Sequence, residues 1–231
     1  MSSKTMHDDI SYKYRADEKS LLRKVLEGTL DKSVYIHSYT PTKVIGRLFD
    51  GVDHLDIRVT GNLPNNFLDY SPVESIILRV DKEGSVNLRS ILTHTGGTKR
   101  FEIIFGDNVT SIDTTHTAFT SNLALEILII RAKNPSFSGV LSGTGPFAYN
   151  NTVLKTIVLD MDSVCALTGN LVSSIYGQNG IGGTIYIPKT LYDHLGDGSA
   201  LDYKSATNWS TYDSYGTITW AQIEGSEYEE A

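Results

Sequence analysis

The chain has 231 residues but a single cysteine, Cys165, so no disulfide can form within it. No apolar run approaches the 18 or more residues that a membrane-spanning helix needs. The residues after Met1 also contain no apolar segment of the kind found in secretory signals, which favours a protein made in the cytoplasm and assembled into a particle over one exported to a cell surface. These absences favour a domain that folds around its own apolar core and does not insert into a membrane.

An excess of positive charge is absent too. The formal net charge is −7 and the isoelectric point is near 5.3, a balance that opposes nonspecific binding to nucleic acid. Part of the negative charge is concentrated at the C-terminus, in Glu224, Glu227, Glu229 and Glu230. We expect residues 223–231 to form a solvated, disordered acidic tail.

Groupings of residues that would indicate catalysis or metal binding are also absent. No two of the six histidines have the i, i+4 spacing of a metal-binding helix, and none stands near Cys165 at metal-ligand spacing. No nucleophile, base and orienting group can be assembled from the sequence. We therefore predict a protein that is not an enzyme and that has no catalytic residues, no metal and no cofactor.

What the chain does contain is a series of short apolar segments at regular spacing. They end at Ile57, Leu78, Phe105, Ile130, Leu159 and Ile187, at successive intervals of 21, 27, 25, 29 and 28 residues. One strand per repeat of roughly 20 to 29 residues is typical of leucine-rich repeats. The predicted fold class is therefore a leucine-rich-repeat solenoid, a β-dominated α/β repeat of short parallel strands stacked into one long core.

Within each apolar segment, the last residue and the residue two before it share a face of the strand and are predicted to point into the core. A phenylalanine recurs upstream of four of the segments and is predicted to fill the interior from the opposite side. These phenylalanines are Phe49, Phe67, Phe119 and Phe147.

The two ends of the solenoid need caps that cover their exposed edges. Residues 17–30 are predicted to form a capping helix, preceded by a polar segment, 1–16, that is either a loose terminus or an arm docking on a neighbour. About six repeats occupy residues 31–187, and a C-terminal cap occupies 188–222. A short helix is predicted to begin with Pro188 at its first position, with Trp209 and Tyr212 packed near it as cap residues.

With the six segments aligned at their last residues, the outward residue between the two core positions is apolar or aromatic in five of them. These five residues, Ile77, Ile104, Ile129, Val158 and Tyr186, are predicted to form a stripe across the sheet, beside Arg58, Arg79 and Arg131. A contiguous apolar surface with arginines at its rim is typical of a protein interface. The stripe is therefore the predicted binding site, unless a loop or the C-terminal segment folds over it.

Several segments resemble the BspA-like leucine-rich repeats. Val109-Thr110-Ser111-Ile112 with Ala118-Phe119 is similar to the internal repeat motif of that family. Residues 185–188 (IYIP) and 203–212 (YKSATNWSTY) are similar to its C-terminal segment. Leu26-Glu27-Gly28-Thr29 resembles the opening of short members encoded by phages and prophages of gut bacteria. The resemblance covers nearly all of residues 20–222, with an apparent insertion at 194–201.

The resemblance implies a phage virion structural or tail-associated protein, made in the host cytoplasm, that binds other virion proteins or a host-surface protein or glycan. A second copy of the chain is a further candidate partner, whereas nucleic acid is not expected. The alternative that the resemblance leaves open is the repeat domain of an adhesin on the bacterial cell surface.

Overall fold

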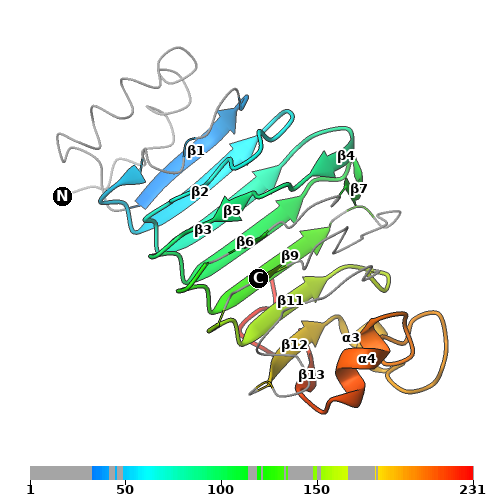
Figure 1. Cartoon of the computed structure of the whole chain (residues 1–231). Helices are drawn as coiled ribbons and strands as arrows, with labels where there is room; N and C mark the ends of the chain where they lie inside the picture. Colours follow the sequence, from blue (N-terminus) through cyan, green and yellow to red (C-terminus); the bar gives the residue numbers. More distant parts are fainter. Residues whose placement is uncertain are drawn as a thin grey trace.

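The computed structural model describes residues 33–41, 45, 49–113, 119–120, 122–132, 134, 148–149, 152–165, 180 and 182–230. This part of the chain is dominated by β-structure, with one large parallel sheet and few helices (Figure 1). The predicted N-terminal arm, 1–16, and capping helix, 17–30, lie outside the described residues.

The large sheet has eight strands, and every hydrogen-bonded pair of neighbours in it is parallel. In the order in which they pair, the strands are β1 (Ser33–Tyr39), β2 (His54–Val59), β3 (Ser75–Val80), β6 (Arg100–Phe105), β9 (Ile127–Ala132), β11 (Thr156–Asp160), β12 (Gly183–Ile187) and β13 (Ile218–Gln222). The prediction of short parallel strands is confirmed, and each of the six predicted segment ends lies within a strand of this sheet. Strands β1 and β13 were not predicted.

Within the described residues, the segments that connect consecutive strands of the large sheet contain five further strands, which form two small parallel sheets. The first pairs β4 (Gly84–Asn87) with β7 (Val109–Asp113), and the second contains β5 (Leu92–Thr93), β8 (Phe119–Thr120) and β10 (Ala148–Tyr149). From β3 to β9 the chain passes through the large sheet, the two-stranded sheet and the three-stranded sheet in turn. The prediction of one strand per repeat is therefore wrong here, because each of these two passages contributes three strands.

The core lies on one side of the large sheet, because alternate side chains of a strand point to opposite faces. One core row runs across β2, β3 and β6 as Ile57, Leu78 and Ile103, all with no exposed surface. Phenylalanines from the connecting segments pack against the core face of the large sheet. Phe49, Phe67 and Phe119 are fully buried, as predicted, whereas Phe147 lies outside the described residues.

The turns on the core side bury backbone groups, and Asn122 satisfies two of them. Its side-chain oxygen accepts hydrogen bonds from the backbone N–H and the hydroxyl of Thr95, and its amide nitrogen donates to the carbonyl of Leu92. Since a buried polar group without a partner is costly, this side chain ties two successive turns together.

The C-terminal end of the large sheet is covered by two short helices, α3 (Lys189–Tyr192) and α4 (Trp209–Ser214) (Figure 1). Pro188 occupies the position before the first helical residue, one place earlier than predicted. Trp209 and Tyr212 are buried, as predicted, and the Trp209 ring nitrogen donates a hydrogen bond of 2.7 Å to the carbonyl of Cys165.

Candidate binding site: the outer face of the large sheet

We call the side of the large sheet that points away from the core its outer face. Strand pairing places one residue of each strand in a row along this face. The row contains Tyr35, Asp56, Ile77, Glu102, Ile129, Val158, Tyr186 and Ala221. Four of the five residues predicted for the stripe lie in this row, and Glu102 stands where Ile104 was expected.

Ile104 lies in the next row, which contains Arg58, Arg79, Ile104, Arg131 and Asp160. The prediction placed it in the stripe because Phe105, as the last residue of its apolar segment, was aligned with Ile57 and Leu78. In the structure Ile103 pairs with Leu78, so the β6 register differs by two residues from the predicted one.

The C-terminal residues 223–230, which we call the tail, fold back over one half of the outer face. Ile129 and Val158 have no exposed surface beneath it, and Ile223 and Tyr228 of the tail are themselves only 5% and 4% exposed. The prediction of a solvated, disordered tail is therefore wrong for these residues. The structure instead has the other predicted arrangement, in which the C-terminal segment covers the stripe. Burying the apolar side chains of the tail lowers the free energy of the folded chain by more than placing its carboxylates at the rim of the contact raises it.

Beneath the tail, Arg131 is the centre of a cluster of charges. Its guanidinium is 4% exposed and donates hydrogen bonds to Glu102, Asp160 and the backbone carbonyl of Tyr228. Burial alone would lower the pKa of Arg131, but the two carboxylates outweigh burial and raise the pKa above its ordinary value. Arg131 therefore stays charged and holds the tail by a charge-assisted hydrogen bond.

The other half of the outer face, across β1, β2 and β3, is open. A shallow hollow there is lined by Tyr35, Ile36, His37, Asp56, Arg58 and Arg79. Arg79 forms a bidentate ion pair with Asp56. Its Nε donates to Oδ1 at 3.0 Å and to Oδ2 at 3.3 Å, and its Nη2 donates to Oδ2 at 3.0 Å. These hydrogen bonds raise the pKa of Arg79. Arg58 forms a more exposed ion pair with Asp81 at 3.1 Å.

The predicted site residues are thus divided between two environments. Ile77, Arg58 and Arg79 lie on the open half, while Ile129, Val158, Tyr186 and Arg131 lie on the half that the tail covers. Ile104 is nearly buried, with 9% of its surface exposed.

Sequence reasoning missed Tyr35, Glu102 and the two tail residues that complete the surface. The signal for Tyr35 was the alternation of apolar Val34 and Ile36 around it, which indicates a strand. The signal for the tail was the pair of apolar side chains, Ile223 and Tyr228, in an otherwise polar segment.

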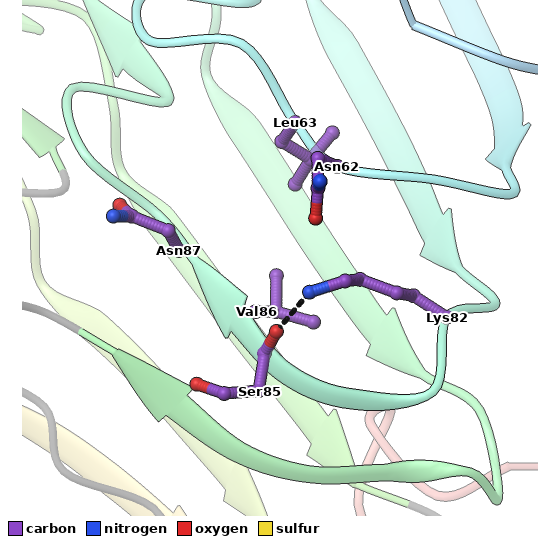
Figure 2. A pocket seen from close by; sticks show the side chains of 6 residues that line it. All are labelled: Asn62, Leu63, Lys82, Ser85, Val86 and Asn87. Carbon is purple, nitrogen blue, oxygen red and sulfur yellow. Dashed lines mark hydrogen bonds between the residues drawn. The ribbon is translucent and has the colours of Figure 1, made fainter.

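A second hollow lies near the carboxyl ends of β2 and β3 (Figure 2). It is lined by Asn62, Leu63, Lys82, Ser85, Val86 and Asn87. Figure 2 shows Lys82 reaching toward Ser85, whose backbone carbonyl accepts a hydrogen bond from the ammonium group. The lining offers amide, hydroxyl and ammonium groups and includes no carboxylate or imidazole.

The described part of the chain contains no group of three or more histidine, cysteine, aspartate or glutamate residues placed to hold a metal ion. Cys165 is buried, and burial raises the pKa of its thiol far above the ordinary value, which keeps the sulfur in its unreactive protonated form. No helix in the described ranges has the length and apolar character to cross a bilayer.

In comparisons with known proteins, no family model, no curated protein and no solved structure matches this chain. What the molecule itself offers is a mixed apolar and charged sheet face, half open and half covered.

Proposed function

We propose that the chain is a leucine-rich-repeat solenoid that acts as a non-enzymatic scaffold for binding other proteins. The regular spacing of the apolar segments and the passage of the chain through three parallel sheets in turn support this fold. The resemblance of residues 185–188 and 203–212 to the C-terminal segment of BspA-like repeats supports it further.

The observation that carries the binding function is the composition of the open half of the outer face. Tyr35 is 47% exposed there, Ile77 is half-buried, and the side chains of Arg58 and Arg79 are 42% and 37% exposed. Aromatic and arginine side chains are enriched at protein interfaces, and here they surround an aliphatic side chain. The parallel strands fix their spacing, so the surface needs little rearrangement to receive a partner.

We infer that the partner is another virion protein or a host-surface protein, and that the chain is a tail-associated or accessory component of a phage particle. The resemblance of Leu26-Glu27-Gly28-Thr29 to the opening of short phage-encoded members supports this location. The alternative is a bacterial cell-surface adhesin. Mass spectrometry of purified particles from an induced lysogen, compared with protease shaving of intact cells, decides between them: peptides of this chain in particles support the proposal, and peptides only in the shaved fraction support the adhesin.

The binding surface is tested by Ile77→Asp, which places a charge at the centre of the open half without entering the core. Leu123→Asp is the matched control, because Leu123 is an aliphatic side chain that is 59% exposed and absent from the outer-face rows. We expect Ile77→Asp to lower incorporation into particles at least tenfold while it remains folded by circular dichroism, and Leu123→Asp to be incorporated as wild type is. Normal incorporation of Ile77→Asp would contradict the proposed surface.

A further inference from the structure

The tail contacts the outer face in the way that a bound peptide contacts a receptor. Ile223 and Tyr228 are its two buried side chains, and they cover Ile129 and Val158. The ring of Tyr228 also packs edge-on against Tyr186, with 4.7 Å between ring centroids. Two anchoring side chains over a small apolar surface are typical of short-segment recognition.

Polar groups of the sheet fix the position of Tyr228. Nη2 of Arg131 donates a hydrogen bond of 2.8 Å to the Tyr228 carbonyl, and Nε of Arg131 lies 3.6 Å from a carboxylate oxygen of Glu230. The guanidinium of Arg100 lies 6.0 Å from the centroid of the Tyr228 ring, within reach of a cation–π contact. The ring contact and the ion pair suit a tyrosine that is followed by an acidic residue.

The tail carries most of its bound conformation within itself. The Ser226 backbone N–H bonds to the Ile223 carbonyl at 2.9 Å, the Ser226 hydroxyl accepts from the Tyr228 N–H at 3.1 Å, and a carboxylate oxygen of Glu229 accepts from the Gly225 N–H at 2.8 Å. Gly225 has a φ of 79°, which suits glycine. These hydrogen bonds join groups within the tail and use no atom of the sheet.

The contact is also separable from the main core. Ile129, Val158, Ile223 and Tyr228 form an apolar cluster of their own, distinct from the main core. The tail begins directly after β13, which is the edge strand of the large sheet, and an edge element can open without disturbing the strands inside the sheet. If the tail leaves, the large sheet keeps its core and exposes an apolar surface beside Arg131.

We propose that the outer face of β9, β11 and β12 is a recognition site for a partner segment that carries an aliphatic residue, a tyrosine five positions later and acidic residues around the tyrosine, and that the tail occupies this site in cis until the partner displaces it. The covered half continues the same rows as the open half, so a partner bound on the open half is placed to reach it. This proposal rests on the proposed function in one respect, which is that both place a partner on the outer face of the large sheet.

The test uses the full-length chain and a fluorescent peptide with the sequence of residues 223–230. In one variant, Ile223→Asp with Tyr228→Ala, the tail loses both anchors. We expect this tail variant to bind the peptide at least tenfold more tightly than wild type does, because in wild type the attached tail competes. Adding Val158→Asp to the tail variant, or replacing the tyrosine of the peptide by alanine, should abolish binding.

Folding is checked separately by circular dichroism and by hydrogen exchange of the wild-type chain. The amide of Ile223, which bonds to the Ile187 carbonyl, should exchange at least tenfold faster than the amides within β11. Exchange as slow as that of β11, unfolding of the tail variant, or a folded tail variant that does not bind the peptide would each overturn the proposal. Wild-type dimers that disappear in the tail variant would assign the site to the tail of a second copy and overturn the partner assignment.

These outcomes are independent of the proposed function. Peptide binding by the tail variant can fail while Ile77→Asp still blocks incorporation into particles. In that case the open half binds a partner and the tail is a permanent cover of the other half.

Discussion

Replacing Arg131 by alanine tests the charge cluster beneath the tail. In the folded chain the Arg131 guanidinium contacts the carboxylate of Glu102 at 2.8 Å, and the Glu102 side chain is only 8% exposed. Without Arg131, Glu102 retains the contact with Arg100 at 3.1 Å but loses its buried partner. The substitution also removes the hydrogen bond to the Tyr228 carbonyl.

The expected loss is large because breaking a buried ion pair costs about 3–5 kcal/mol in the free energy of unfolding. The matched control is Arg79→Ala, which removes an arginine from the same row of the sheet. The Arg79 side chain is 37% exposed and its partner Asp56 is 21% exposed, so its loss should cost only about 0–1 kcal/mol. The two substitutions thus remove the same chemical group from buried and open parts of one face.

Urea unfolding at pH 7, followed by circular dichroism, measures both differences. The double variant Arg131→Ala with Glu102→Gln should be more stable than Arg131→Ala alone, because it no longer buries an underpaired carboxylate. A loss for Arg131→Ala no larger than that for Arg79→Ala, or no gain from Glu102→Gln in that background, would refute the description of Arg131 as a buried, charge-matched centre.

The outcome for Ile104 shows how far strand register can be predicted from the sequence. Ile103, Ile104 and Phe105 are three consecutive apolar residues, so the apolar segment does not mark one end position. A shift of two residues leaves every side chain on its predicted face, because the period of a strand is two. The sequence therefore predicts that Ile104 points outward, but it does not predict that Ile104 pairs with Arg79 and Arg131 on the neighbouring strands.

The structures of the tail and of β13 could not be predicted from the composition of these segments. The acidic residues of 223–230 predict solvation, but Ile223 and Tyr228 pack on the sheet and Arg131 bonds to the Tyr228 carbonyl. In β13, Ile218, Trp220 and Gln222 alternate with Thr219 and Ala221, a weaker period-2 pattern than in the other strands. Tertiary contacts decide both segments, and local sequence carries little of that information.

The pairing of Asp56 with Arg79 could not be predicted either, because it joins residues 23 positions apart on adjacent strands. Both residues were visible as outward-facing positions. Their contact depends on the diagonal offset between rows of the sheet, which the register alone determines.

The remaining predictions concern buried groups of the core and the C-terminal cap. Ile157→Asp should cost more than about 4 kcal/mol in urea unfolding, because Ile157 is fully buried in a core row and the new charge has no partner; an unchanged midpoint would contradict its inward direction. Trp209→Ala should cost about 3–5 kcal/mol, since a fully buried ring and a hydrogen bond to Cys165 are lost, and a melting temperature equal to that of wild type would exclude its role in the cap. Asp202→Asn tests pH dependence. Burial alone would raise the pKa of Asp202, but backbone N–H donors from residues 196, 198 and 204, at 2.9, 3.1 and 2.8 Å, outweigh burial and lower it. Because the pKa is lower in the folded chain than in the unfolded chain, the carboxylate stabilises the fold above about pH 4 and this contribution is lost as the pH falls through the folded-state pKa. Asp202→Asn should therefore cost about 2 kcal/mol at pH 7 and progressively less below pH 4, and a difference in unfolding free energy that does not change between pH 7 and pH 3 would show that the charge of Asp202 is not what holds this loop.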